Sequence, residues 1–254
     1  MKHFYNFVLK KSGDSIVLLL IIAGFFIAQI PDFQLDASSD SLVLEGDRNL
    51  RYYESIKKNY GSDDYLVISY QVKDQLLDPK QLAHLKRLKT DLQGIDQIRS
   101  VTTILDVPLF RSPPLKLVDL ASASVTIENG NADLALASNE FKTSPLYANN
   151  LVSKDGNTTA ILVSLKSNAR FAQLRQQRDE MRLKRAYDQL SKDELNKLKT
   201  IEKQVLRNSS TKSDLQAKTI ADIRHVLDQY RDKAGLFLGG LPMITTDIVN
   251  YISN

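Results

Sequence analysis

Residues 65–72 read YLVISYQV, and β-branched and aromatic side chains make up most of this stretch. Such side chains favour strands. A run that is mostly apolar is typical of a strand with neighbours on both sides. We therefore expect residues 65–72 to form the central strand of a sheet, and the water-soluble body of the chain to pack around it.

Helical and strand signals alternate after this strand. A helix predicted at 79–92 begins after Asp78, has proline in its first turn and carries leucines at three-to-four spacing. The other predicted elements are strands at 98–105, 158–166 and 235–239, a short helix at 134–141 and a longer one at 214–233. The order strand, helix, strand, strand, helix, strand is that of the ferredoxin-like split βαβ, so we expect an α+β fold.

The segment before the central strand divides into two parts. Residues 32–45 are polar and form an irregular lead-out. Asp47 can cap a helix that continues to about Tyr60 and that Gly61 ends. The like-charged pair Asp63 and Asp64 could bind a cation, but a solvated turn is the favoured interpretation.

The segment from 169 to 210 is longer than the crossover between two strands needs. Its apolar positions are sparse, which favours two helices packed on each other over a second globular core. We expect a helical hairpin with breaks at Ser191 and at 208–210. Ser191 with Glu194, and Ser213 with Gln216, match the capping box that opens a helix. This hairpin is a candidate docking arm for a partner outside the membrane.

The apolar run at 16–30, IVLLLIIAGFFIAQI, carries no formal charge and ends at Pro31. Its length of about 22 Å as a helix is short of a hydrocarbon core, so a signal peptide is an alternative. Bulky residues around Ala28 disfavour cleavage, and we expect an uncleaved transmembrane helix. Lysines before the run place the N-terminus in the cytoplasm and the rest outside. We expect a bacterial inner membrane protein with a periplasmic domain.

The sequence lacks the usual catalytic signatures. It contains no nucleophile elbow, zinc-protease, P-loop or dinucleotide motif, and no cysteine. The three histidines, His3, His84 and His225, are far apart, and a solvent-facing position is expected for the last two. The net charge of +4 is concentrated in the helical region, where interspersed acidic residues favour solvated helices over nucleic-acid binding. We expect no enzyme activity, no metal, no cofactor and no nucleic-acid partner.

Three motifs occur in a fixed order. The apolar run is followed by Phe33-Gln-Leu-Asp-Ala-Ser-Ser-Asp40, and residues 47–64 lead straight into the central strand. Phe237-Leu-Gly-Gly-Leu-Pro242 then precedes an amphipathic stretch at 243–252. Together they resemble the opening of exporters of the resistance–nodulation–division (RND) superfamily, in its hydrophobe and MMPL-type branch. The positions that carry the resemblance are Asp36, Asp40, Asp47, Gly61, Asp63, Asp64, Gly239, Gly240 and Pro242.

The resemblance implies a first transmembrane helix followed by a ferredoxin-like periplasmic porter domain of a proton-driven exporter of hydrophobic or amphipathic molecules. In that family the proton-relay residues lie on central membrane helices, so none can be assigned in this chain. We expect a fragment of the transporter whose partners are the lipid bilayer and the remaining membrane helices or a second subunit; a homo-oligomer is also compatible. The expected parts are 1–31 cytoplasmic end and membrane helix, 32–168 first part of the porter domain, 169–210 hairpin, 211–242 closing helix and strand, and 243–254 start of a helix.

Two other functions remain open. The chain could be a single-pass, membrane-anchored periplasmic adaptor or scaffold with the hairpin as its docking arm. It could also be an anchored hydrolase of unrecognised motif, although no nucleophile stands with a plausible base.

Overall fold

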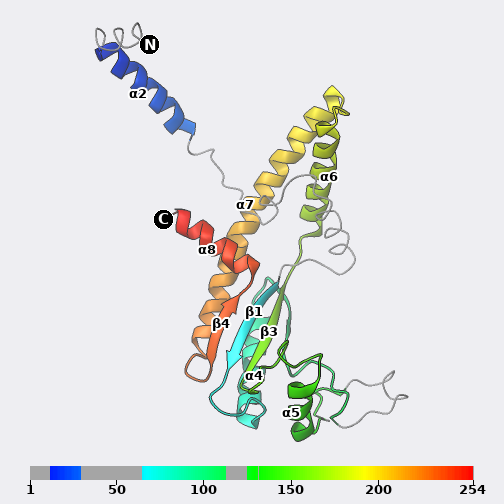
Figure 1. Ribbon diagram of the computed structural model, residues 1–254. Helices are drawn as coiled ribbons and strands as arrows, with labels where there is room; N and C mark the ends of the chain where they lie inside the picture. Colours follow the sequence, from blue (N-terminus) through cyan, green and yellow to red (C-terminus); the bar gives the residue numbers. More distant parts are fainter. Residues whose placement is uncertain (1–11, 30–64, 113–124, 131, 254) are drawn as a thin grey trace. The chain divides into compact units, whose positions relative to one another are not determined.

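The computed structural model describes residues 12–29, 65–112, 125–130 and 132–253 of the chain (Figure 1). The chain forms two compact units, 1–41 and 42–254, and each is described by itself. The predicted lead-out at 32–45 and helix at 47–60 lie outside the described residues. Six of the positions that carry the RND resemblance also lie outside them, namely Asp36, Asp40, Asp47, Gly61, Asp63 and Asp64.

The larger unit is an α+β body built on one four-stranded antiparallel sheet. The strand order is β2-β3-β1-β4, so β1 is a central strand, as its sequence predicts (Figure 1). Ile68 lies opposite Ile161 of β3 and opposite Leu238 of β4. The strands are β1 (Tyr65–Gln71), β2 (Ile98–Thr102), β3 (Thr158–Leu165) and β4 (Gly235–Gly239).

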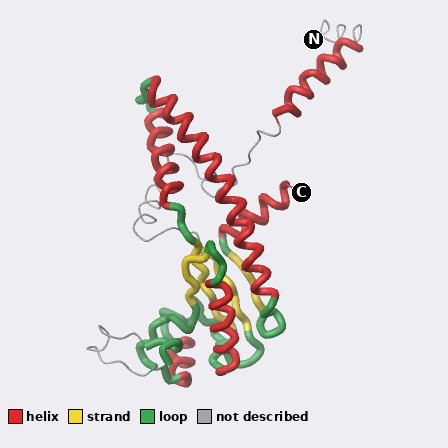
Figure 2. The backbone as a smooth tube through the Cα atoms, turned by 180° about the vertical axis from the view of Figure 1, so that it is seen from behind, coloured by secondary structure: helices red, strands yellow, loops and turns green. Residues whose placement is uncertain are grey.

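Helices α4 (Pro79–Gln93) and α7 (Lys192–Asp228) cover one face of the sheet (Figures 1 and 2). Asp78 caps α4 by accepting from the amide of Lys80 at 2.8 Å, and Pro79 opens the helix. The predicted leucine stripe of α4 has four members. Leu85, Leu88 and Leu92 are buried, and Leu82 is half-buried. Each such side chain contributes about 1.5–3 kcal/mol by leaving water. Helix α5 (Leu134–Thr143) lies in the connection from β2 to β3.

The hairpin consists of α6 (Ala169–Ala186) and the first half of α7. Its small core of Phe171, Ile201 and Val205 is separate from the core of the sheet, as the sparse pattern predicts. The capping box of Ser191 with Glu194 opens α7 and is confirmed.

The predicted helix break at 208–210 is wrong, because α7 is one helix of 37 residues. Asn208 donates its amide to the carbonyl of Gln204 at 2.7 Å, and Thr211 donates to that of Arg207 at 3.2 Å. These polar side chains bond back to their own helix instead of capping a new one. The box predicted for Ser213 and Gln216 therefore does not begin a helix.

Helix α2 (Ser12–Gln29) lies in the smaller unit and contains most of the apolar run. Its described apolar side chains are exposed on all sides; Leu19 and Phe26 are 67% and 66% exposed. Among the helices within the described ranges, none is both long and apolar enough to cross a membrane. The predicted transmembrane helix is therefore unsupported.

Candidate functional site at the junction of the sheet and the last helix

The chain leaves the sheet through the glycine and proline positions that the sequence singles out. β4 ends at Gly239, which pairs with Val67, and α8 (Leu241–Ser253) begins two residues later. Gly240 has a φ of 127°. A Cβ there would lie 3.0 Å from the Tyr65 carbonyl oxygen and 3.2 Å from the Leu66 Cα. Only glycine fits this conformation and this close approach to β1.

A side-chain amide of α7 holds the start of α8. Gln216 donates from Nε2 to the Pro242 carbonyl at 2.7 Å and lies 3.2 Å from the Thr246 hydroxyl and 3.3 Å from that of Thr245. The sequence suggested Gln216 only as a capping residue and gave no signal for this contact, because its acceptors lie 26 to 30 residues away.

A second contact ties the two helices further along α7. Arg224 of α7 donates to Asp247 of α8 at 2.7 Å. This hydrogen bond raises the pKa of Arg224, so the guanidinium stays charged. Both side chains are more than a third exposed, so the pair contributes little to stability. Its role is to fix the orientation of α8 against α7.

The opposite side of α8 is apolar and exposed. Ile244, Ile248 and Tyr251 are 47%, 49% and 87% exposed and follow helical spacing. Thr246, on the side facing α7, is buried. Helix α8 therefore has one face that is fixed to the domain and one apolar face that is exposed to water.

Helix α7 joins three parts of the larger unit. Ile201 packs in the hairpin core, Ile220 and Ile223 pack in the core of the sheet, and Gln216 holds α8. At 1.5 Å per residue its 37 residues extend about 55 Å. A force on the hairpin can therefore reach the start of α8 along a single helix.

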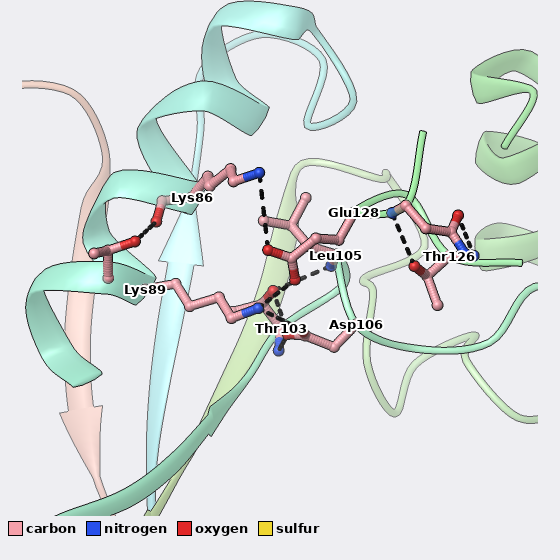
Figure 3. Close-up of polar contacts among 9 residues, drawn as sticks. Lys86, Lys89, Thr103, Leu105, Asp106, Thr126 and Glu128 are labelled. Carbon is pink, nitrogen blue, oxygen red and sulfur yellow. Dashed lines mark hydrogen bonds and ion pairs between the residues drawn. The ribbon is translucent and has the colours of Figure 1, made fainter. Parts of the chain in front are cut away.

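A charged cluster lies beside α4 (Figure 3). Lys89 donates to Asp106 and Glu128, which lie on segments after β2. The carboxylate of Asp106 also accepts from the amide of Thr103 at 2.8 Å and from its hydroxyl at 3.0 Å. The Lys89 side chain is only 10% exposed. Sequence reasoning missed this cluster, because its members are 17 and 39 residues apart and form no motif.

In this cluster, hydrogen bonding shifts the pKa values more than burial does. Burial lowers the pKa of Lys89, but its bonds to Asp106 and Glu128 raise the pKa by more than burial lowers it, so the net shift is upward. Burial raises the pKa of Asp106, while the bonds from Lys89 and the Thr103 amide lower it more, so the net shift is downward. The charged forms are therefore stabilised, and the cluster ties two loops to α4 instead of supplying a general base.

Glu140 of α5 has a similar structural role. Its carboxylate is buried and accepts from the amides of Phe110 and Arg111 at 2.8 and 2.9 Å. The hydroxyl of Ser112 donates to it at 2.8 Å. These bonds fix the loop before α5 and leave the carboxylate engaged on both oxygens.

The larger unit also has a cavity of about 500 Å³ beside α5, lined in part by Phe141, Lys142 and Asp155. Within the described residues, no group of three or more histidine, cysteine or acidic residues is placed to hold a metal. His225 is exposed, while His84 is half-buried and its Nδ1 lacks a partner within the described parts. None of these features pairs a nucleophile with a base.

No model of a known protein family matches this chain, and no curated protein matches it.

The contact of Gln216 with α8 leads to a prediction. Replacing Gln216 with leucine removes the donor to Pro242, Thr245 and Thr246, and we expect faster amide hydrogen exchange in 241–253 and a loss of about 1 kcal/mol of stability. Gln204→Leu makes the same change at an exposed position of α7 and serves as the control. Equal exchange in the two variants would show that Gln216 does not hold α8.

Proposed function

We propose that this chain is the N-terminal part of a proton-driven RND-type exporter of hydrophobic or amphipathic molecules. It would supply the first membrane helix, α2, and a periplasmic porter domain of ferredoxin-like type. In that domain the first half of α7 belongs to the hairpin and its second half is the second helix of the sandwich. One observation carries the proposal. The sheet has the order β2-β3-β1-β4, and β4 leads through Gly239 and Gly240 directly into α8, whose second residue is Pro242.

The arrangement supports a mechanical role. A porter domain works by moving as a body against its partner. Helix α7 links the hairpin, the sheet and α8 through Ile201, Ile220 and Gln216. Movement at the hairpin would therefore change the position of α8, whose apolar side would adjoin the membrane domain. The class of substrate rests on the family resemblance alone.

The exposed side chains of α2 support membrane contact. Ile16, Leu20 and Phe25 are each more than 60% exposed, and lipid would remove this apolar surface from water. Neighbouring membrane helices would cover the polar ends of such a short helix.

The second candidate is a membrane-anchored periplasmic adaptor. The turn of the hairpin favours it, because Tyr187 is 69% exposed and Leu183 is 45% exposed there. Exposed aromatic and aliphatic side chains of this kind are common anchors in protein interfaces. In this case the hairpin would be the docking arm.

Topology can be tested directly, because the chain has no cysteine. We expect the 254-residue chain, expressed in a Gram-negative cell, to stay in the membrane fraction after alkaline extraction. In spheroplasts, a membrane-impermeant maleimide should label Leu206→Cys on α7. A cysteine at His3 should be labelled only after lysis.

The matched variants Leu19→Lys and Leu19→Ala test the role of α2. The lysine should release part of the chain, because a charge at the centre of a membrane helix costs about 2.5–3.5 kcal/mol on insertion scales. The alanine should not. Recovery of the unmodified chain in the soluble fraction would contradict membrane attachment. Labelling of Leu206→Cys only after lysis would contradict a periplasmic position of the larger unit.

A further inference from the structure

The sheet has a second face that no helix of the described ranges covers (Figure 1). Phe237, Tyr65 and Leu162 point to this side and are 65%, 44% and 39% exposed. The register places these side chains together: Val67 lies opposite Leu162, Ser69 opposite Phe237, and Tyr65 opposite Ser164. These six residues define the open sheet face.

The open sheet face carries no charge. Alternate residues of a strand share one face, and the positions of β1, β3 and β4 on this side are all uncharged. The one charged residue of the four strands is the exposed Arg99 on the edge strand β2, at the register shift between Ile98 and Ser100. One quarter of the whole chain is charged. An antiparallel sheet that faces water usually alternates apolar with polar or charged side chains. An apolar centre without charges is therefore more typical of a covered surface.

A face without charges is complementary to its own copy. In a two-fold interface each residue meets the same patch of the partner, so any charge near the axis would oppose a like charge. Here nothing repels, and only a few hydroxyl groups would be desolvated. The four strands have seven, five, eight and five residues. At about 3.3 Å per residue and 4.8 Å between strands they cover roughly 400 Å² per copy. The total of about 800 Å² is the size of a weak, transient interface.

We propose that the open sheet face is the docking surface for the same face of a second copy of this chain. The two sheets would pack about 10 Å apart with their apolar centres interdigitated. Val67 and Leu162 would lie near the two-fold axis, and Phe237 would lie between side chains of the partner. The modest area implies a reversible dimer. This inference holds for an exporter and for an adaptor alike.

Cross-linking tests the dimer on the full chain in detergent. Because the chain has no cysteine, Leu162→Cys introduces a single thiol. We expect a bis-maleimide that spans about 10 Å, the spacing of packed sheets, to join two copies at this position in a concentration-dependent manner. Leu206→Cys is the matched control: this leucine is 42% exposed on α7, away from the sheet, and should give little cross-linking.

A charge introduced on the open sheet face provides the second part of the cross-linking test. Phe237→Glu should lower the Leu162→Cys cross-link yield by roughly tenfold or more, since each copy would bury an unpaired carboxylate among uncharged side chains of the partner. Leu206→Glu should leave the yield unchanged, and circular dichroism should show both variants folded. Equal cross-linking of Leu162→Cys and Leu206→Cys, or a yield insensitive to Phe237→Glu, would overturn the proposal. Failure of the thiol at Leu162→Cys to react in the monomer would also overturn it, because the chain itself would then cover the face.

Discussion

Replacing Gly240 with alanine is expected to destabilise the larger unit by about 3 kcal/mol, because only glycine readily adopts the backbone conformation at this position. The φ of 127° is unfavourable for any residue with a Cβ. The new methyl group would also contact the backbone of β1 at Tyr65 and Leu66, neither of which is a flexible side-chain end. Urea unfolding followed by circular dichroism measures the loss.

The neighbouring glycine is the control for this prediction. A Cβ at Gly239 would find its nearest neighbour, the Val67 carbonyl oxygen, at 3.8 Å, which is ordinary contact. We expect Gly239→Ala to change the free energy of unfolding by less than about 1 kcal/mol. Equal stability of the two variants would contradict the close approach of Gly240 to the backbone of β1.

Lys89→Met is expected to destabilise the larger unit by about 3 kcal/mol, because it leaves Asp106 and Glu128 without their cation. Methionine retains much of the length of the lysine stem, so the loss reports the charge more than the packing. Lys86→Met is the matched control on the same helix. Lys86 is 61% exposed and lies 3.9 Å from Glu128, so we expect a change of less than about 0.5 kcal/mol.

The stability difference between Lys89→Met and the unmodified chain should depend on pH. Asp106 has a lowered pKa in the folded state, so its stabilising contribution is present above the ordinary aspartate pKa of about 4 and is lost as the pH falls through the folded value. Lys89 has a raised pKa, so its contribution is lost only as the pH rises through that higher value. The difference should therefore shrink in acid. A constant difference down to acid unfolding would show that the cluster is not ionised as described.

Much of the fold follows from local sequence patterns. The alternation in Leu66, Ile68 and Tyr70 predicts the buried side of β1, and these residues are buried. The strand predicted at 98–105 ends early because Thr103 begins a turn in which Asp106 accepts from its amide and hydroxyl. Such a turn is hard to distinguish from a strand by β-propensity alone.

The contacts of the candidate site could not be predicted in the same way. Asn208 in α7 has a polar side chain that suits either a helix end or a bond to its own helix, and in the structure it makes the second. Gln216 and Lys89 bind groups on distant segments, and only the folded chain brings these together. Gly239, Gly240 and Pro242 were singled out from the sequence through the family resemblance, but the close approach of Gly240 to Tyr65 and Leu66 could not be predicted.

The native polypeptide tests the proposed function most directly. An antibody against the larger unit should detect, in membranes of the source cell, one polypeptide much longer than 254 residues, and mass spectrometry should find several long apolar segments after residue 254. That result would be expected of an exporter. A membrane-bound polypeptide of 254 residues would favour the adaptor, and a polypeptide of that length in the soluble fraction would contradict both.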